Sequence, residues 1–324
     1  MNKILHFILF IGIALSVACD NTGPDMTAAG VKQQSQTALE LDNGQICLAV
    51  SPDVGRIVWF GKSGGKNLLW LNDQTSIEQA LKKSLWPNYG GDKIWPAQEA
   101  IWPVIYRSSF PASHAFDGKP WKVIESGRTK IVMESGTCPY LAIKGVREIS
   151  LEGNSAVIKN KLTRMQNNPF PVHIWAVTQI RRPEYCLLNM YDPGAYRIRS
   201  WSRQSNSMQI FTREKVLFYP TNQDGCLNEK IGCMGDFVAG VFDDVIFMQK
   251  TSFNLEGCYP DKASIEVYLC REYVELETLS ESKLLKKDES IENKVIWTIL
   301  ITASVKDIAA TAEILNHNRL STGL

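Results

Sequence analysis

Short runs of β-branched and aromatic residues, bounded by turn-forming residues, recur along most of the chain and constrain its fold most strongly. Many of these runs alternate, as in Ile265–Leu269 and Tyr273–Glu277, so that successive side chains point to opposite faces of a strand. Helical spacing is limited to Ser76–Leu85 and Val305–Leu315, and neither follows a βαβ rhythm. We therefore predict an all-β fold: a large antiparallel β-sandwich over residues 38–304, with one or two short peripheral helices.

The segments that predict strands are bounded by Gly, Asn, Asp and Pro, and neither a repeat nor a linker interrupts them. They include Ile46–Val50, Arg56–Phe60, Lys130–Glu134, Ala156–Thr163, Val172–Ile180, Val216–Tyr219, Asp236–Val241, Val245–Gln249, Ala263–Leu269 and Lys294–Thr302. We expect one domain, followed by a C-terminal helix and tail over residues 305–324.

The N-terminus has the pattern of an export signal followed by a tether. A basic start precedes an apolar run, Ile4–Ala18, that is short for a bilayer span and typical of a signal peptide. Ser16-Val17-Ala18-Cys19 resembles a bacterial lipobox, which predicts removal of residues 1–18 and lipidation of Cys19. Residues 19–37 would then tether the domain to a lipid anchor in the cell envelope, on the periplasmic face or the outer-membrane surface. Ser16 and Ala18 also suit an ordinary signal peptidase, which would release the protein into the periplasm.

The charge balance argues against a polyanionic partner. The chain has 35 Lys and Arg against 34 Asp and Glu, and loss of residues 1–18 removes Lys3, which leaves 34 − 34 = 0. Nucleic-acid binding needs a clustered cationic surface, so we expect no nucleic-acid partner, and no membrane contact besides the anchor. Nine Trp residues, five of them between Trp70 and Trp121, offer flat apolar faces that suit core packing or sugar stacking.

Cysteine and motif patterns indicate no cofactor. The cysteines and histidines lack zinc-ligand spacing, and nucleotide-binding and hydrolase motifs are absent from the sequence, so we expect neither a metal nor a cofactor. In an exported chain Cys226 and Cys233, which flank a short polar loop, could form a disulfide. The alternative is that the cysteines are buried, reduced and packed as small apolar side chains.

Three segments are more specific than ordinary β-sandwich sequence. They are Asp53–Phe60 with Asn67–Trp70, Trp86–Gln98 continuing to Trp121, and Cys258–Asp261 with Tyr273–Leu279. Their order of Gly-Arg-Ile, Asn-Leu-Leu-Trp, Tyr-Gly-Gly-Asp-Lys-x-Trp-Pro, Tyr-Pro-Asp and Glu-Leu-Glu-Thr resembles the bacterial DUF4380 family. That family is grouped with the galactose-mutarotase-like supersandwich of aldose 1-epimerases. The resemblance covers most of residues 40–302 and implies an antiparallel sandwich with a sugar-binding concave face, without implying one reaction.

The resemblance also implies a catalytic base. In aldose 1-epimerases a Glu on a late strand takes the proton of the anomeric hydroxyl, and Glu277 lies in the similar segment here. Glu275 lies two residues away on the same strand face, where repulsion could raise the pKa of one carboxyl group. The two carboxylates could instead bind sugar hydroxyls, bind a cation such as Ca²⁺, or belong to a solvated strand face.

The catalytic acid has two candidates. The epimerases carry a His on a middle strand, and His173 lies in that region, with Trp175 on the same strand face as a binding candidate. His114, in a loop, is the second candidate. The alternatives are that His173 is a half-buried packing residue and that His114 is merely exposed.

The Trp-rich segment is the main binding candidate. Gly90 and Gly91 allow a tight turn, and we place Asp92 and Lys93 in that turn as a hydrogen-bond acceptor and a cation. Tyr89 and Trp95 would offer stacking faces, and Arg56 would grip a sugar hydroxyl. These aromatics could instead pack a loop onto the sandwich, and Arg56 could form a buried ion pair.

Two main functions follow, with a third as an alternative. The first is an exported, monomeric carbohydrate-binding protein that acts on its sugar weakly or not at all. The second is an aldose 1-epimerase with Glu277 as base and His173 or His114 as acid. The third is a non-catalytic structural lipoprotein of the envelope.

Overall fold

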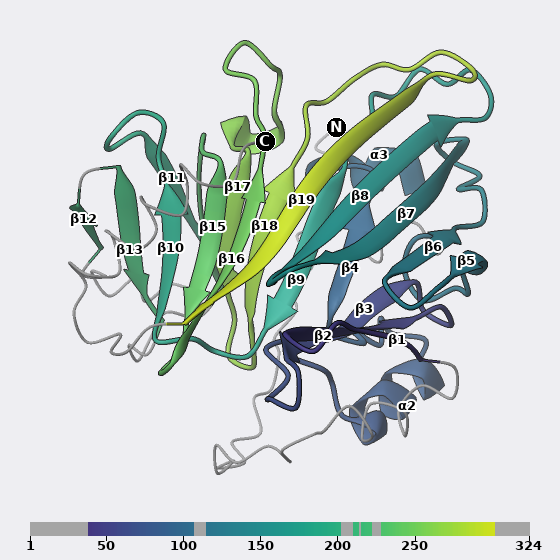
Figure 1. Ribbon diagram of the computed structural model, residues 1–324. Coiled ribbons are helices and arrows are strands. Elements are labelled where there is room, and N and C mark those ends of the chain that lie inside the picture. Colours follow the sequence, from purple (N-terminus) through teal and green to yellow (C-terminus); the bar gives the residue numbers. More distant parts are fainter. Residues whose placement is uncertain (1–37, 107–114, 202–209, 214, 222–227, 302–324) are drawn as a thin grey trace.

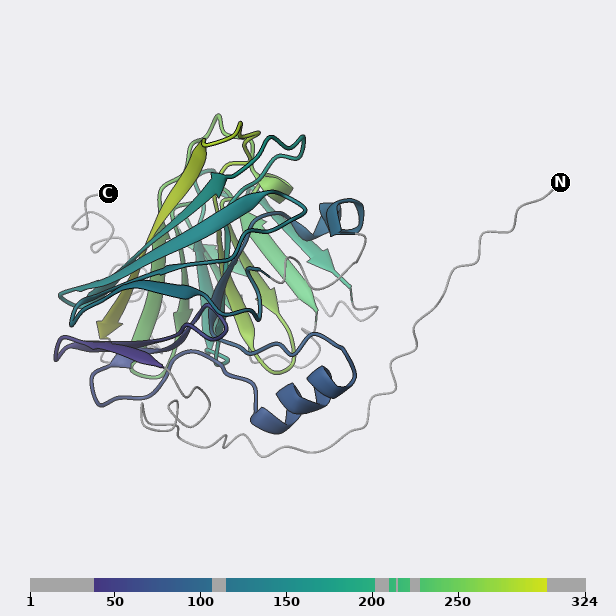
Figure 2. The same ribbon diagram turned by 90° about the vertical axis from the view of Figure 1, so that its right-hand side faces the viewer.

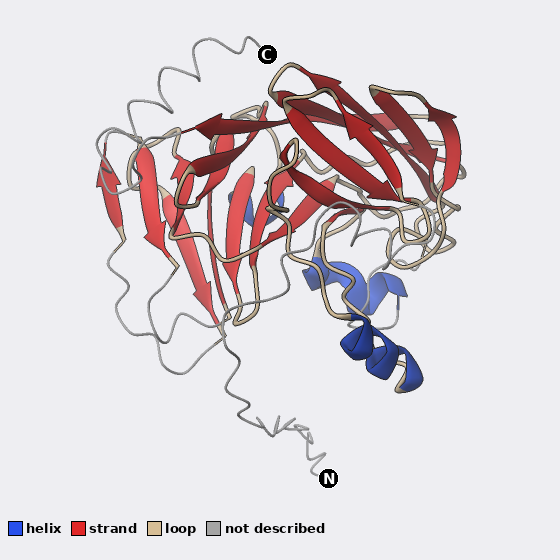
Figure 3. Cartoon of the chain, turned by 60° about the horizontal axis from the view of Figure 1, so that its bottom comes forward, coloured by secondary structure: helices blue, strands red, loops and turns tan. Residues whose placement is uncertain are grey.

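The computed structural model describes residues 38–106, 115–201, 210–213, 215–221 and 228–301. Most of the regular structure in these residues is antiparallel β-strand, arranged in two large sheets (Figures 1 and 3). The all-β antiparallel sandwich predicted from the sequence is therefore confirmed. Within the same residues, no helix combines the length and the apolar character that crossing a membrane requires. Cys19 and His114 lie outside the described residues, as do the segments in which we predict a signal peptide, a tether and a C-terminal helix.

The first sheet has nine described strands, each antiparallel to its neighbours. In spatial order they are β1 (Leu39–Asp42), β2 (Ile46–Ser51), β3 (Arg56–Lys62), β4 (Asp92–Trp95), β9 (Trp175–Ile180), β18 (Val274–Leu279), β17 (Ile265–Leu269), β14 (Glu229–Cys233) and β11 (Tyr196–Ser200). Strands from the beginning, middle and end of the chain thus lie side by side at the centre of this sheet.

The second sheet has ten described strands. In spatial order they are β12 (Phe211–Arg213), β13 (Val216–Pro220), β10 (Tyr185–Asn189), β15 (Phe237–Val241), β16 (Val245–Thr251), β19 (Ser290–Ile301), β8 (Ser155–Arg164), β7 (Ile143–Glu152), β6 (Lys130–Glu134) and β5 (Lys122–Ser126). The long strands β19, β8 and β7 cross the molecule beside one another (Figure 1).

The described helical elements are short: α2 (Gln74–Lys82), η1 (Glu99–Ile101), α3 (Trp102–Tyr106) and η2 (Pro260–Lys262). Helix α2 confirms the helix predicted near Ser76–Leu85 and lies outside the sheets (Figure 2). It begins two residues earlier because Asp73, not Ser76, is the N-cap: its Oδ1 accepts a hydrogen bond from the Ser76 backbone N–H at 2.9 Å.

The space between the sheets holds an apolar core with a polar network in it. Phe60 of the first sheet packs against Phe247 and Trp297 of the second, with ring centroids 5.0 and 5.2 Å away. Asp92 accepts hydrogen bonds from Arg147 of β7 and from Thr178 Oγ1, the latter at 2.8 Å. The Asp92 side chain therefore points into the sandwich, and its charge is compensated there.

Two local expectations need correction. Asp92 and Lys93 lie in strand β4 and not in a turn, because the turn is made by Gly90 and Gly91, with φ of 83° and 67°. Strand β9 begins at Trp175, three residues later than the predicted strand.

The described cysteines are free thiols and all except Cys258 are buried. Cys226, the predicted partner of Cys233, lies outside the described residues.

Candidate functional site

One face of the nine-stranded sheet carries a band of charged and aromatic side chains that points away from the sandwich interior. Asp92 and Thr178 bond to side chains of the second sheet, so their neighbours along each strand point to the opposite, outer face. Strand register arranges this band in three adjacent rows: Trp95, Trp175 and Leu279; Lys93, Val177, Glu277 and Glu266; and Gln179, Glu275, Tyr268, Lys230 and Arg199.

Lys230 is the centre of this band. Its Nζ donates hydrogen bonds to Oε2 of Glu266 at 3.1 Å and to Oε2 of Glu277 at 2.8 Å. The same ammonium group lies 4.7 Å from the ring centroid of Trp175, whose Nε1 donates to Glu277 Oε2 at 2.6 Å. Burial alone would lower the pKa of Lys230, but the carboxylates of Glu277 and Glu266 outweigh burial and raise it.

The carboxyl groups in the band do not titrate alike. Burial raises the pKa of Glu266 to about 8, against the opposing effect of Lys230. Burial also raises the pKa of Glu275, although Lys93 counteracts it. Near neutral pH Glu266 therefore holds a proton in much of the population, and a protonated carboxyl group can donate a hydrogen bond or act as an acid.

A cavity of about 180 Å³ opens over Lys230 and Glu266, and we call it the Trp175–Trp201 cavity. Trp201 is 57% exposed and packs edge-on against Tyr268, with ring centroids 6.1 Å apart. Arg199 forms an ion pair with Asp261 at the same cavity. The lining residues are Gln98, Glu99, Ala100, Trp175, Arg199, Trp201, Lys230, Pro260, Asp261, Glu266 and Leu279.

Five predicted site residues lie on this face, and three of them, Trp175, Glu277 and Glu275, are close to the cavity. Trp175 lines the cavity itself. Glu277 is 0% exposed and lies behind Lys230 and Trp175, and its Oε1 has no hydrogen-bond partner among the described residues. Glu275 accepts a hydrogen bond from Gln179 Nε2 at 2.8 Å, one row further along the sheet. The structure thus brings both predicted carboxylates close to the cavity without exposing Glu277 to it.

Lys93 and Trp95 lie on the same face but are covered. Lys93 Nζ lies 4.6 Å from the Trp95 ring centroid, 5.5 Å from that of Trp86 and 3.8 Å from Glu275 Oε1. Burial lowers the pKa of Lys93 to about 8. Trp95 is packed edge-on against Trp102 and Trp175, with centroids at 5.0 and 5.1 Å. Trp95 therefore packs against Trp175, which lines the cavity, and neither Lys93 nor Trp95 lines it.

Arg56 and Tyr89 belong to a structural network further from the cavity. Arg56 is fully buried, pairs with Asp117 and donates from NH1 to the Gly90 carbonyl at 2.6 Å. The guanidinium carbon lies 5.6 Å from the centroid of the half-buried Tyr89. The same Asp117 accepts hydrogen bonds from the indoles of Trp86 and Trp95 at 3.0 and 3.1 Å. Both terminal nitrogens of the Arg56 guanidinium group are thus bonded to protein atoms, and Arg56 does not line the cavity.

His173 lies beside the cavity and not in it. It is 2% exposed and lines a second cavity of about 350 Å³, which we call the His173 cavity. Burial lowers the pKa of its imidazole to about 3, so the ring is neutral near pH 7. A neutral imidazole is a weak proton donor, so this geometry does not support the acid role predicted for His173.

Sequence reasoning missed Lys230, Glu266, Arg199 and Trp201. The alternation of Ile265–Leu269 predicts that the Glu266 side chain points away from the core. No local sequence pattern indicates that Glu266 pairs with Glu277 across two strands. Lys230 and Arg199 are placed by strand pairings between segments about 30 or more residues apart. Such pairings carry no sequence signal of their own.

A larger cavity, of about 850 Å³, lies at the opposite end of β9 beside Trp70. Several of its charged groups are already satisfied by protein atoms: Lys62 pairs with Asp244 at 3.2 Å, and the Arg182 guanidinium group donates to the carbonyls of Thr221 and Cys270. We place the candidate site at the smaller cavity, because it lies over the strand face that carries Glu277 and Trp175, two residues to which the sequence assigns a site role.

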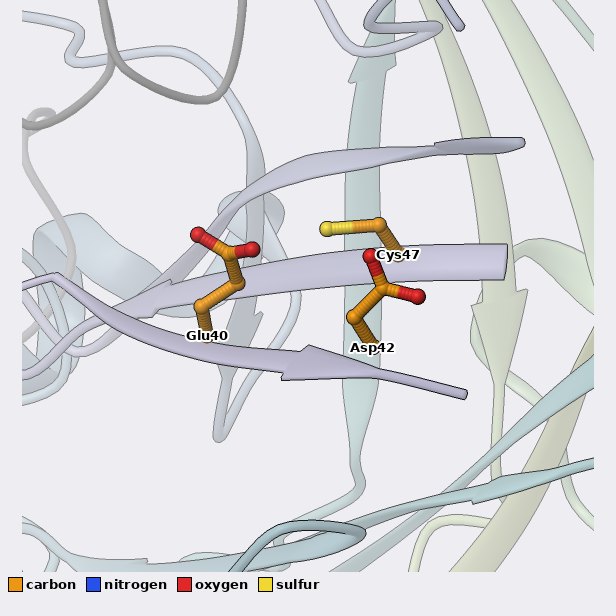
Figure 4. Close-up of side chains that lie close together, drawn as sticks. All are labelled: Glu40, Asp42 and Cys47. Carbon is orange, nitrogen blue, oxygen red and sulfur yellow. The ribbon is translucent and has the colours of Figure 1, made fainter. Parts of the chain in front are cut away.

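Glu40, Asp42 and Cys47 form a cluster whose potential ligand atoms lie within 4.8 Å of one another (Figure 4). Asp42 and Cys47 are directly paired on β1 and β2. Burial, reinforced by the two carboxylates, raises the pKa of the Cys47 thiol to about 12, whereas metals bind the thiolate. Asp42 Oδ1 already accepts from Gly44 N at 2.7 Å and from Ser63 Oγ at 2.6 Å. We assign no metal to this cluster.

No protein-family model matches the sequence, and no curated protein sequence is significantly similar to it. Solved structures are similar to it in fold. A galactose mutarotase-like protein from Lactobacillus casei matches with a TM-score of 0.56 at 7% identity, over 82% of this chain and 100% of its own.

Two further structures give the same result. Galactose 1-epimerase from Lactobacillus acidophilus matches with a TM-score of 0.51 at 10% identity, over 80% of this chain and 92% of its own. A galactose mutarotase-like protein from Clostridium acetobutylicum matches with a TM-score of 0.51 at 10% identity, over 81% of this chain and 95% of its own. At such low identity the similarity concerns the fold and leaves the reaction open. The chain therefore has the galactose-mutarotase-like β-sandwich fold that the sequence resemblance implied.

Proposed function

We propose that this protein binds a carbohydrate in the Trp175–Trp201 cavity. The observation that carries this proposal is the convergence of two indole rings with Lys230, Arg199, Asp261 and Glu266 around one open cavity. A sugar ring presents an apolar C–H face and a rim of hydroxyl groups. Flat aromatic faces match the first, and charged donors and acceptors match the second.

The balance of charges favours a neutral sugar. Glu99, Asp261 and Glu266 line the cavity together with two cations, Arg199 and Lys230. Both cations are already paired with carboxyl groups of the protein, Arg199 with Asp261 and Lys230 with Glu266 and Glu277. A sulfated or phosphorylated glycan would have to displace these carboxylates, whereas neutral hydroxyl groups can add hydrogen bonds to them.

Isothermal titration calorimetry with D-glucose, D-galactose, D-mannose, L-arabinose and D-xylose, and with disaccharides built from them, tests this proposal. At least one of these sugars should bind saturably, and replacement of Lys230 by Met should weaken that binding at least tenfold. Heat signals without saturation for every sugar, or unchanged affinity in Lys230→Met, would contradict it.

One observation favours an aldose 1-epimerase activity as a second candidate. Glu266 and Glu277 are directly paired across β17 and β18, and the raised pKa of Glu266 makes it the protonated member. In this version Glu266, which lines the cavity, protonates the ring oxygen in place of His173 or His114. Glu277 accepts the proton of the anomeric hydroxyl after Lys230 or Trp175 moves aside, because these side chains cover it. Polarimetry should then show accelerated mutarotation that Glu277→Gln and Glu266→Gln each abolish. If the wild-type protein does not accelerate mutarotation, the epimerase candidate is refuted and only the proposal of carbohydrate binding remains.

The sequence supports further proposals about placement and family. The lipobox-like segment at Cys19 motivates an exported, lipid-anchored protein of the cell envelope. The Tyr-Gly-Gly-Asp-Lys-x-Trp-Pro segment motivates membership of the DUF4380 family. We also propose that the protein is a monomer. Radiolabelled palmitate incorporation that is lost in Cys19→Ala tests the anchor, and light scattering of the purified protein tests the monomer.

A further inference from the structure

The Trp175–Trp201 cavity and the His173 cavity are adjacent. Their volumes are about 180 and 350 Å³, and Gln98, Pro260 and Asp261 line both. These shared residues form a single dividing wall, and we call Pro260–Asp261 the wall segment.

The wall segment has an unusual backbone conformation and is held by one ion pair. Asp261 has a φ of 55° and Lys262 a φ of 58°, a left-handed conformation that non-glycine residues adopt only at a cost. The Asp261 carboxylate forms an ion pair with Arg199 on the side of the Trp175–Trp201 cavity. The carboxylate is therefore held at the boundary between the cavities, where it can accept a hydrogen bond from a ligand in either.

The His173 cavity has the composition expected of a second sugar position. Ile101, Phe170 and Pro171 give it an apolar wall, and His173 is its buried polar group. Nε2 of His173 has no hydrogen-bond partner among the residues that the structure describes. A buried polar atom without a partner is costly, and a hydroxyl group of a ligand would satisfy it after a small movement of the ring.

Size gives an independent argument. Pockets that enclose drug-sized ligands span roughly 300–1,000 Å³. The Trp175–Trp201 cavity, at about 180 Å³, falls below that range, whereas the two cavities taken together lie within it. The Trp175–Trp201 cavity is thus small for anything beyond a single sugar ring, and the pair offers room for at least two linked rings.

We propose that the two cavities are consecutive subsites of one cleft and that the ligand is an oligosaccharide of at least two units. One unit stacks between Trp175 and Trp201, and the next crosses the wall segment and bonds to His173. This inference rests on the proposed carbohydrate function and adds the length of the ligand to it. A protein with only the first subsite would bind a disaccharide and its component sugar with similar affinity.

Calorimetric titration of the full-length protein tests the inference. The probes are D-glucose against maltose and cellobiose, D-galactose against lactose, and D-mannose against mannobiose. The measured quantity is the ratio of disaccharide to monosaccharide affinity. It should reach at least about tenfold for one pair, because a second sugar ring adds contacts in its own subsite.

Two variants place the gain in the His173 cavity. His173→Phe removes the polar group, and Val104→Trp fills the cavity from helix α3, where Val104 is 69% exposed and folding should not suffer. Both variants should reduce the ratio to about one. The matched control is Leu85→Trp, a change at an exposed position that lines neither cavity, and it should keep the ratio of the wild-type protein.

The outcomes distinguish failure of the second subsite from failure of carbohydrate binding as a whole. Saturable binding with a ratio near one in the wild-type protein, or a high ratio that survives both His173→Phe and Val104→Trp, overturns the second subsite and leaves carbohydrate binding intact. Absence of binding by every probe overturns the proposed function, and the second subsite with it.

Discussion

Glu266 and Glu277 face each other directly across strands β17 and β18, and a single ammonium group, Nζ of Lys230, donates a hydrogen bond to each carboxyl group. Two like charges directly opposite each other in a sheet are destabilising. Lys230 compensates them, and the raised pKa of Glu266 reduces the charge further. The floor of the candidate site therefore depends on one cation.

Replacing Lys230 by Met should destabilise the protein, because it leaves two buried carboxyl groups without their cation. Removal of one partner from a buried ion pair costs about 3–5 kcal/mol, and we expect a loss in that range in urea denaturation at pH 7. The control is Lys62→Met. Lys62 pairs with Asp244 at 3.2 Å on the surface, so its loss should cost less than about 1 kcal/mol. Equal losses in the two variants would refute the compensating role of Lys230.

Replacing Glu266 by Gln should change how stability depends on pH. The pKa of Glu266 is raised from 4.5 to about 8 in the folded protein, so between these pH values the folded state holds a proton that the unfolded state has released. The free energy of unfolding contributed by this group therefore falls as pH rises through the window. Glu266→Gln removes that contribution, so its stability relative to wild type should increase from pH 5 to pH 8.

Denaturation midpoints at pH 5, 6, 7 and 8 check this slope. Glu152→Gln, a change at the exposed end of β7, is the matched control and should follow the wild-type profile. A Glu266→Gln profile parallel to that of wild type would show that Glu266 is ionised in the folded protein across this range.

Replacing Asp117 by Asn should affect folding and spare binding. Asp117 pairs with the fully buried Arg56 and accepts hydrogen bonds from the indoles of Trp86 and Trp95. Burial alone would raise the pKa of Asp117, but the charges of Arg56 and Lys93, together with the hydrogen bonds from Arg56 and Trp86, lower it. The neutral amide leaves Arg56 uncompensated, which should cost about 3–5 kcal/mol in urea denaturation. The sugar affinity of the folded protein should change less than about twofold, because this network does not line the cavity. A large loss of affinity at full stability would instead assign Arg56 and Asp117 to the ligand.

Replacing Trp201 by Ala should have the opposite pattern. Trp201 is exposed and lines the cavity, so its loss should weaken sugar binding about tenfold and change the free energy of unfolding by less than about 1 kcal/mol. Tyr140→Ala removes another exposed aromatic side chain, 52% accessible and away from the cavity, and should keep the affinity of wild type. Calorimetric titration of the three proteins with the same sugar compares them. Equal affinity of Trp201→Ala and Tyr140→Ala would exclude Trp201 as a stacking face.

The sequence predicts the strands and the face of Glu275 and Glu277 because both follow from local alternation. It does not predict that Lys230 lies between Glu266 and Glu277, because that contact depends on strand order in a nine-stranded sheet. The Arg56–Asp117 pair joins residues 61 positions apart, so the sequence left open whether Arg56 binds a ligand or forms a buried ion pair. The sequence predicts that Asp92 and Lys93 lie together in one turn. Strand alternation places the two side chains on opposite faces of β4.

The most direct test of the central claim is to locate a bound sugar through the indole N–H signals of the nine tryptophans. A two-dimensional ¹H–¹⁵N spectrum is recorded during titration with the tightest-binding sugar, and Trp175→Phe, Trp201→Phe and Trp70→Phe assign the three informative signals. We expect the signals of Trp175 and Trp201 to shift with one common dissociation constant, while that of Trp70, at the larger cavity, stays in place. A shift of the Trp70 signal with those of Trp175 and Trp201 unmoved would contradict the account.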